Sequence, residues 1–349
     1  MPKRIEQIKN WLEDELQAEI KSFAPASNDA SFRRYFRVVF HNRITEQAAG
    51  LSFIVMDAPP EKENIAPFID IASCIEKTGV HVPHLYAINR TSGFILMSDL
   101  GNTAYLSLLA SGNGAERADK LYSDAMSALL LMQMGMRPEL LSTMNTSLPD
   151  YDAERLRQEM TLLPDWYIKV HCQQALKDNE QAVLEQAMQR LIASAQEQPQ
   201  VFVHRDYHSR NLMFESELNP GVIDFQDAVI GPITYDLVSL LRDSYIAWSE
   251  EQVYTWVEQY RQKLLTEKLL ATDDKAQFTR WFDWMGIQRQ LKVVGIFCRL
   301  NYRDGKSNYL DDIPQTLDYL VKVCARYPEF SDLLQLLTRL ENQRLRDCR

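Results

Sequence analysis

Apolar residues near the start of the chain recur every three or four positions. They are Ile5, Ile8, Trp11, Leu12, Leu16 and Ile20. This spacing is the period of an amphipathic helix, in which residues three and four apart share one face. The sequence therefore predicts an opening helix with one buried side.

After this helix the pattern shortens to runs of β-branched and aromatic residues. Such runs predict strands over residues 32–40, 51–56, 84–89 and 94–97, with a helix over about 64–77 between the second and the third. The first hundred residues are therefore expected to form a small β-rich lobe with one inserted helix.

From residue 101 onward the apolar spacing is almost entirely helical. Helices are predicted near 116–135, 151–162, 174–197, 234–248, 250–268, 275–301, 312–326 and 329–346. Short apolar runs at 201–203, 212–214 and 222–224 predict strands, and the turn over 215–221 predicts that the last two pair as a hairpin. We expect an α+β, bilobal fold, with a small lobe over 1–100 and a large helical lobe over 101–349.

Composition limits the class of protein. The chain has 349 residues, of which 46% are hydrophobic, enough for a large core. Its net charge of -10 argues against a nucleic-acid partner, which a basic surface would bind. The five cysteines lack metal-ligand spacing and are expected to be reduced thiols, and no apolar run predicts a membrane span or signal peptide. A cytoplasmic protein is expected.

The strongest chemical signal lies just after the apolar run at 201–203. Asp206 is followed five residues later by Asn211 and thirteen residues after that by Asp224. Phosphoryl transfer from ATP uses one carboxylate to accept the proton of the attacking hydroxyl, and an amide and a second carboxylate to hold magnesium. The spacing therefore predicts a kinase.

The pattern H-x-D-x-H-x-x-N, followed by I-D-F-x-D, resembles the aminoglycoside phosphotransferase and choline kinase superfamily, whose members are related to the protein kinases. The resemblance implies a protein-kinase-like fold in which the first lobe binds ATP. It also implies that Asp206 is the catalytic base, that Asn211 and Asp224 bind Mg2+, and that Asp236 is a structural acid bracing the loop.

One residue of the motif matches the protein kinases themselves: Arg205 stands where the superfamily usually has a small residue. However, only residues 225–234 lie between Asp224 and the helical run at Tyr235, which leaves no room for an activation loop. We expect Arg205 to form a structural ion pair, the alternative being a phosphate sensor. A small-molecule kinase is therefore favoured.

The expected nucleotide side departs from the kinase pattern. Met56 occupies the place of the strand lysine that contacts the phosphates. The phosphates could instead contact the polar turn over residues 26–31 and the arginines that follow it, Arg33 and Arg34. The alternative is an ordinary turn with solvated arginines. The adenine could meet the backbone of a hinge over 96–101, whose alternative is an edge strand ending in a turn. The candidate nucleotide-binding residues are Ser27, Asn28, Ser31, Arg33, Arg34, Met97 and Asp99.

The expected acceptor side is a cationic segment near the C-terminus. Residues 285–306 carry five basic side chains and one acid, and the candidate substrate contacts are Gln288, Arg289, Lys292 and Arg299. If this helix face lines the acceptor pocket, it disfavours polycationic antibiotics and suits a neutral or anionic hydroxyl compound. The alternative is a solvated or ion-paired face.

Three further residues near the motif carry weaker expectations. Asp227 is expected either to contact the acceptor or a second metal ion, or to cap the following turn. His204 and His208 are expected to be packed loop residues and not a metal pair, because no third ligand lies near them in the sequence.

A closer resemblance covers nearly the whole chain. The segments 31–37, 55–61, 286–297 and 303–306 resemble the bacterial N-acetylmuramate/N-acetylglucosamine anomeric kinases of cell-wall recycling, and make Met56 characteristic of that subgroup. The resemblance implies ATP-dependent phosphorylation of the sugar at C1, with ATP and Mg2+ and without a membrane or obligatory protein partner. A kinase for another small alcohol, such as choline, homoserine or an antibiotic, and a non-catalytic scaffold remain the alternatives.

Overall fold

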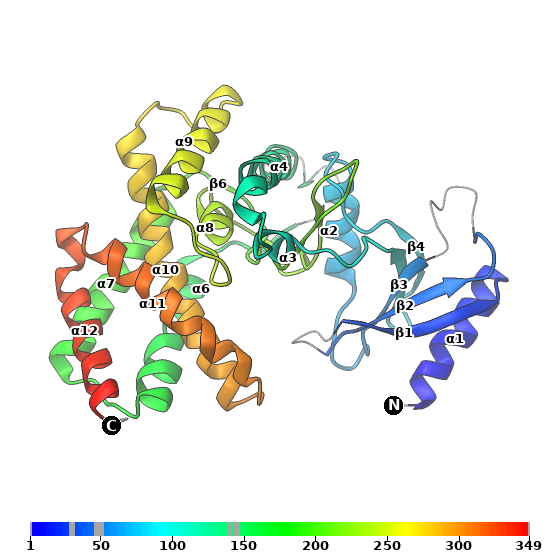
Figure 1. Ribbon diagram of the computed structural model, residues 1–349, viewed down its shortest axis with the longest axis horizontal. Coiled ribbons are helices and arrows are strands. Elements are labelled where there is room, and N and C mark those ends of the chain that lie inside the picture. Colours follow the sequence, from blue (N-terminus) through cyan, green and yellow to red (C-terminus); the bar gives the residue numbers. More distant parts are fainter. Residues whose placement is uncertain (1, 28–31, 45–51, 138–140, 143–146, 348–349) are drawn as a thin grey trace. The chain divides into compact units, whose positions relative to one another are not determined.

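The computed structural model describes all of the chain except residues 1, 28–31, 45–51, 138–140, 143–146 and 348–349. Its residues form two compact units (Figure 1). The sheet unit comprises residues 1–103 and 212–227, and the helical unit comprises residues 104–211 and 228–349. The division into functional domains at residue 100 stays a prediction.

The described part of the sheet unit contains a five-stranded antiparallel sheet in the order β1-β2-β3-β5-β4. Its strands are β1 (Ile20–Ser27), β2 (Arg34–Phe40), β3 (Ser52–Asp57), β4 (Leu85–Asn89) and β5 (Phe94–Ser98), and its helices are α1 (Pro2–Leu16) and α2 (Ala66–Glu76). Ile8 and Leu12 of α1 are buried in one apolar cluster with Val38 and Phe53. This burial anchors α1 on the sheet.

The opening of the chain differs from the prediction at Ile20. The predicted helix includes this residue, but α1 ends at Leu16 and Ile20 begins β1. Gln17 has a φ of 50°, in the left-handed region, which a right-handed helix does not pass through. The apolar spacing therefore continues past the point at which the backbone leaves the helix.

Residues 212–227 form a strand pair of their own and join the rest of the sheet unit through a backbone hydrogen bond and an aromatic contact. β7 (Leu212–Met213) and β8 (Gly221–Val222) are antiparallel, with Leu212 opposite Val222, as the predicted hairpin requires. The amide of Val222 donates to the carbonyl of His81 at 2.8 Å. Phe225 stacks on Phe68 of α2, with the ring centres 4.9 Å apart.

The helical unit is built from long helices and one short strand pair. Its α-helices are α3 (Tyr105–Leu109), α4 (Gly114–Gly135), α6 (Ala153–Met160), α7 (Asp178–Glu197), α8 (Tyr235–Leu241), α9 (Glu250–Thr266), α10 (Lys275–Tyr302), α11 (Ile313–Cys324) and α12 (Ser331–Asp347). A π-helix, η1 (Leu163–His171), and two 3-10 helices, η2 (Ser307–Asp312) and η3 (Pro328–Phe330), complete it with β6 (Gln200–Val203) and β9 (Val229–Pro232). The predicted α+β class is confirmed.

Two elements of the helical unit differ from the prediction. The helix expected over 234–248 ends at Leu241, because Asp243 accepts a hydrogen bond from the amide of Tyr245 at 3.0 Å and closes a turn there. β9 pairs with β6 although Gly231 and Pro232 are typical of a turn. No apolar pattern at residues 229–232 predicts this pairing.

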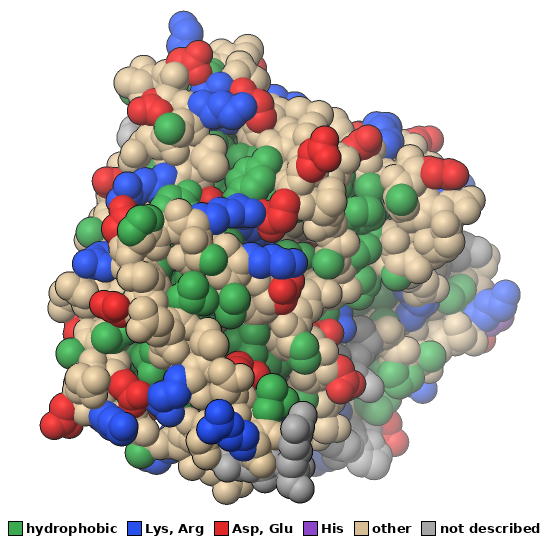
Figure 2. All heavy atoms as spheres, turned by 60° about the vertical axis from the view of Figure 1, so that its left-hand side comes forward, with side chains coloured by type: hydrophobic (Ala, Val, Ile, Leu, Met, Phe, Trp, Pro, Cys, Tyr) green, Lys and Arg blue, Asp and Glu red, His purple; other side chains and the backbone are tan. Residues whose placement is uncertain are grey.

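The surface of the molecule is charged, and its helices are polar or short. Figure 2 shows one face of the molecule, on which Lys and Arg side chains lie among Asp and Glu side chains. Within the described ranges, every helix is too short or too polar to cross a membrane.

Candidate active site

The segment His204–Asn211, here called loop 204–211, follows β6 and is braced at its start by Asp236 of α8. The Asp236 carboxylate accepts hydrogen bonds from the amides of His204, at 2.6 Å, and Arg205, at 3.0 Å. Arg205 has a φ of 77°, a conformation that costs energy for a non-glycine residue unless its surroundings fix it. Burial raises the pKa of Asp236 to about 7. Asp236 therefore holds a strained backbone next to Asp206.

A second buried carboxylate, that of Asp243, braces the other half of the loop. It accepts hydrogen bonds from the amide of Ser209, at 3.0 Å, and from the hydroxyl of the same residue. Within the loop, the side-chain amide of Asn211 donates to the carbonyl of Asp206 at 2.9 Å. Sequence reasoning missed Asp243, since an acid just past an apolar helix usually marks only a turn.

The carboxylate of Asp206 is half-buried and surrounded by positive charge. Burial by itself would raise its pKa, but the charges around it lower the pKa below its ordinary value. In decreasing order of effect these groups are Lys292, His208, Arg205 and Arg289. At neutral pH Asp206 is therefore ionised, as a group that accepts a proton must be.

Glu159 of α6 pairs with two of the cations around Asp206. This residue is not singled out by the sequence. It forms ion pairs with Lys292, at 3.0 Å, and with Arg205, and accepts a hydrogen bond from the hydroxyl of Tyr151. Burial would raise the pKa of Glu159, but Lys292 and Arg205 lower it. The ion pair expected of Arg205 is thus confirmed. Its partner could not be predicted from the local sequence, because Glu159 lies 46 residues away in the chain.

Helix α10 turns a buried polar face toward this network. Lys292 donates to the hydroxyl of Tyr235 at 3.0 Å in addition to its pair with Glu159. Gln288 is fully buried and Arg289 is 4% exposed. Among the described residues, neither amide atom of Gln288 and neither Nε nor Nη1 of Arg289 has a hydrogen-bond partner. These three residues are buried, so the alternative of a solvated face does not describe them, whereas the alternative of an ion-paired face does describe Lys292.

The rest of the cationic segment differs from this buried part. Arg299 is half-buried, and burial, followed by the charge of Arg303, lowers its pKa. Arg303 is exposed and pairs with Asp304 at 2.7 Å. The basic side chains of α10 therefore fall into paired and unpaired groups.

The two histidines of the loop are enclosed. His204 is fully buried, and burial lowers the pKa of His208, whose ring meets Tyr245 edge-on with the centres 5.4 Å apart. Nδ1 of His208 has no hydrogen-bond partner in the part of the chain that the structure describes. In that part, no three acidic, histidine or cysteine side chains cluster as metal ligands would.

In the sheet unit, the predicted phosphate-binding arginines are matched by acids. Arg33 pairs with Glu63 at 3.3 Å. Arg34 pairs with the fully buried Asp57, which also accepts a hydrogen bond from Nε of Arg4 at 2.6 Å. The alternative for this turn supposed solvated arginines, but both arginines form ion pairs with acids.

The remaining nucleotide candidates have mixed surroundings. Asp99 accepts hydrogen bonds from Arg37, at 2.6 Å, and from the hydroxyl of Ser52, and Met97 is buried in β5. Ser27 ends β1 opposite Tyr35. Asn28 and Ser31 lie outside the described residues.

Asp224 follows β8 in the sheet unit, with a left-handed φ of 67°. Its Oδ1 accepts a hydrogen bond from Nε2 of Gln226 at 2.9 Å, and the same nitrogen donates to Asp227 at 3.2 Å. Asp227 also acts, with Tyr35 and Glu63, against the burial of Arg33 to raise that group's pKa. Asn211 and Asp224 each carry a side-chain oxygen of the kind that Mg2+ takes from proteins.

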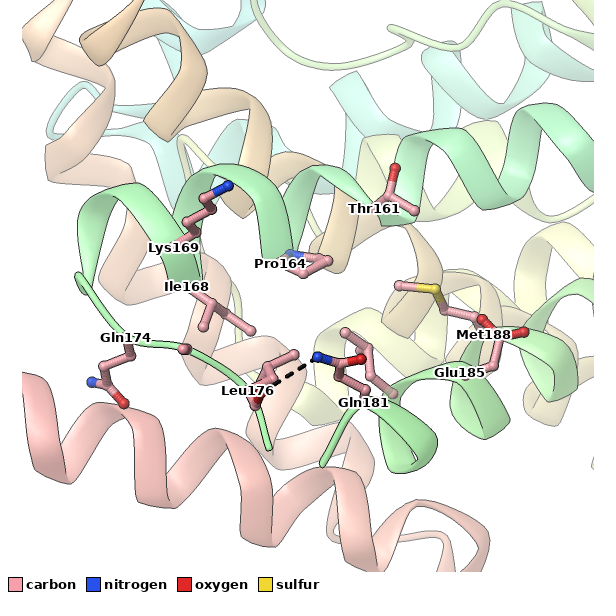
Figure 3. A pocket seen from close by; sticks show the side chains of 11 residues that line it. Thr161, Pro164, Ile168, Lys169, Gln174, Leu176, Gln181, Glu185 and Met188 are labelled. Carbon is pink, nitrogen blue, oxygen red and sulfur yellow. Dashed lines mark hydrogen bonds between the residues drawn. The ribbon is translucent and has the colours of Figure 1, made fainter. Parts of the chain in front are cut away.

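Two hollows of the helical unit do not include Asp206 in their lining. One, of about 490 Å3, is lined by Asp152, Glu154, Arg155, Gln158, Glu159 and Arg205. Figure 3 shows another, mostly apolar, between η1 and α7, where Ile168 and Leu176 face it and Gln181 donates to the carbonyl of Leu176. It contains none of the predicted site residues.

Comparison with known proteins adds a family and full-length relatives. Residues 22–274 match the model of the phosphotransferase enzyme family. An N-acetylmuramate/N-acetylglucosamine kinase of Pseudomonas putida is 40% identical over 348 residues, which cover 97% of each chain, and one of Pseudomonas aeruginosa is 41% identical over 347 residues with the same coverage. A solved ADP-bound aminoglycoside phosphotransferase has the same fold, with a TM-score of 0.57 at 14% identity over 91% of this chain and 98% of its own.

Proposed function

Because this chain belongs to the phosphotransferase enzyme family, we propose that it transfers a phosphoryl group from ATP to the anomeric C1 hydroxyl of N-acetylmuramate or N-acetylglucosamine. The resemblance seen in the loop motif is confirmed by the family match and the relatives. The observation that carries the proposal is identity of about 40% over nearly the full length with two kinases of that name. An ATP-dependent reaction suits the cytoplasm, where we place the enzyme.

Asp206 is the proposed base of this reaction. Its carboxylate accepts the proton of the sugar hydroxyl as that oxygen forms its bond to phosphorus, and the bond from phosphorus to the leaving ADP oxygen breaks. The surrounding cations keep Asp206 ionised, and the two braces from Asp236 and Asp243 fix its loop. Positioning and proton removal are the contributions that this unit makes to the chemistry.

Asn211 and Asp224 are the proposed Mg2+ ligands. The ion, when bound, neutralises charge that develops on the phosphate oxygens. For the nucleotide itself, Ser27, Asn28, Ser31, Met97 and Asp99 remain proposals from the sequence. Arg33 and Arg34 also remain proposals, but their acidic partners reduce the charge that either could offer to a phosphate.

The acceptor is proposed to meet the buried polar face of α10. Gln288, Arg289, Lys292 and Arg299 are its candidate contacts, while Asp227 remains a weaker candidate on the sheet unit. A basic wall repels polycationic aminoglycosides and favours neutral or anionic sugars. This supports a sugar over an antibiotic as the substrate.

An acceptor panel tests the proposal. The protein is incubated with ATP and Mg2+ and with N-acetylmuramate, N-acetylglucosamine, choline, homoserine or kanamycin, and ADP release is followed. We expect acceptor-dependent release with the two amino sugars, abolished by removing Mg2+ with EDTA. Release with choline, homoserine or kanamycin alone would select another small-molecule kinase, and release with none would select a scaffold.

A further inference from the structure

The basic residues of α10 differ in whether an acid already neutralises them. Lys292 pairs with Glu159 at 3.0 Å, and Arg303, directly after the helix, pairs with Asp304 at 2.7 Å. Lys275 and Arg280, nearer the start of the helix, also pair with acids. Among the described residues, Arg289 and Arg299 form no ion pair. Their charges are the two on this helix that remain for a ligand.

Of these two, Arg289 is the more deeply buried. It is 4% exposed, and two of its donor nitrogens have no hydrogen-bond partner among the described residues. A buried guanidinium that forms no ion pair is costly, because it has lost its hydration and has no acid in direct contact to replace it. Such a group fits a site whose counter-charge arrives with a ligand. Gln288, beside it, is fully buried and lacks partners for both amide atoms in the same part of the chain.

Arg289 also lies within electrostatic reach of the proposed base. Its charge lowers the pKa of Asp206 and of His208, and it also acts on Asp236 and Tyr245. Arg299 is not among the groups with the largest effects on the pKa of Asp206. A ligand that neutralises Arg289 must therefore lie beside the hydroxyl that Asp206 deprotonates, which is the place of the acceptor.

Building on the proposed function, we propose that Arg289 binds the carboxylate of an acidic amino sugar and thereby determines the preference between acidic and neutral acceptors. The names of the two relatives join one sugar that carries a carboxylate with one that does not. The acidic sugar supplies the missing counter-charge, whereas the neutral sugar leaves Arg289 to water. A charge-assisted contact of this kind is stronger than a neutral one.

The test compares three arginine variants of one helix. We measure kcat/KM for N-acetylmuramate and for N-acetylglucosamine, and KM for ATP, in Arg289→Gln, Arg299→Gln and Arg303→Gln. We expect Arg289→Gln to lose about 10- to 100-fold with the acidic sugar, as for a charged contact, and less than about twofold with the neutral one. KM for ATP should stay unchanged. The exposed, paired Arg303 is the control, and its variant should match the wild type on both sugars.

Several results would overturn the assignment. Equal losses on both sugars, or a raised KM for ATP, would mean that Arg289 contacts the transferred phosphate. If only Arg299→Gln loses kcat/KM selectively with N-acetylmuramate, the residue that contacts the carboxylate is Arg299 and not Arg289. If the wild type phosphorylates neither sugar, the proposed function itself is overturned. If the wild type is active but Arg289→Gln is unselective, only the role of Arg289 is overturned.

A binding measurement covers the case in which a variant folds poorly. N-acetylmuramate should raise the melting temperature of the wild type and of Arg289→Lys, which keeps the charge, and should shift Arg289→Gln much less. Equal shifts in Arg289→Lys and Arg289→Gln would contradict a charge-based contact.

Discussion

The arginines of the two units differ in whether an acid matches every one of them. In the sheet unit, two half-buried arginines of β2 meet acids: Arg34 pairs with Asp57, and Arg37 with Asp99. In the helical unit, the buried Arg242 pairs with Asp283 and Lys292 pairs with Glu159, but Arg289 of α10 forms no ion pair with any described residue. Both regions look equally basic in the sequence.

The difference teaches that clustering of basic residues does not reveal which charge is available to a ligand. The partner of Arg34 is 23 residues away and that of Arg205 is 46 residues away, so each pairing depends on the fold. A cation that forms no ion pair, but lies within electrostatic reach of the proposed base, marks the acceptor side of the proposed site. Matched cations mark structural roles.

The largest expected effect comes from the proposed base in the helical unit. Asp206→Asn removes the proton acceptor and should lower kcat by about 10²- to 10⁴-fold, with nucleotide affinity largely kept. Steady-state kinetics and ADP titration measure the two quantities. Asp304→Asn, at an exposed acid beyond α10, is the control. An unchanged kcat in Asp206→Asn would remove this residue as the base.

The next effect tests whether matching of charge stabilises the helical unit. Glu159→Gln leaves the buried Lys292 and the half-buried Arg205 without their acid and should lower the free energy of unfolding by about 3–5 kcal/mol. Glu154→Gln, at an exposed acid of the same helix, should change it little. Chemical denaturation measures both variants, and equal stabilities would show that the Glu159 network is not a structural anchor.

The pH dependence of the same variant sharpens this prediction. The pKa of Glu159 lies below its ordinary value of 4.5 in the folded protein, so its contribution is present above about pH 4.5 and is lost as pH falls through the folded pKa. The stability difference between wild type and Glu159→Gln should therefore shrink in acid. A difference that grows as pH falls would contradict the ion pairs.

A smaller effect is expected from the proposed metal ligand at the end of loop 204–211. Asn211→Ala removes an oxygen ligand, and the Mg2+ concentration for half-maximal activity should rise about 10- to 100-fold. Asn211→Asp, which keeps an oxygen at this position, should need less Mg2+ than Asn211→Ala. The same Mg2+ requirement in wild type and Asn211→Ala would exclude Asn211 as a ligand.

The smallest effect returns to the comparison itself. Arg34→Gln leaves the buried Asp57 with Arg4 as its remaining charged partner, and should lower the free energy of unfolding by about 1–3 kcal/mol. Arg289→Gln removes an unmatched buried charge and should not lower it. Urea denaturation measures the free energy of unfolding of both variants. A larger decrease in Arg289→Gln than in Arg34→Gln would contradict the distinction between matched and unmatched arginines.

Much of the fold could be predicted because its elements have a clear period. The strands around Val38 and Val55 and the long helices follow apolar spacing that depends only on neighbouring residues. β1 was missed because polar residues and Pro25 interrupt its apolar pattern, and β9 because Gly231 and Pro232 indicate a turn. These strands form through pairing with neighbours that local sequence does not specify.

The site shows the same limit. Asp206, Asn211 and Asp224 could be singled out because their spacing is local and chemically specific. Glu159 and Asp243 could not, since each acts on a segment far from it in the chain. The ion pair of Arg205 was expected, but its partner and the fact that Lys292 shares it depend on how α6 and α10 pack.

The position of phosphate on the sugar tests the central claim most directly, namely that Asp206 acts on the anomeric hydroxyl of an amino sugar. The protein is incubated with ATP, Mg2+ and N-acetylglucosamine labelled with carbon-13 at C1, and the product is examined by phosphorus NMR. A phosphorus signal coupled to the labelled carbon is the predicted result. A phosphate on another carbon, or no sugar phosphate at all, would contradict the account.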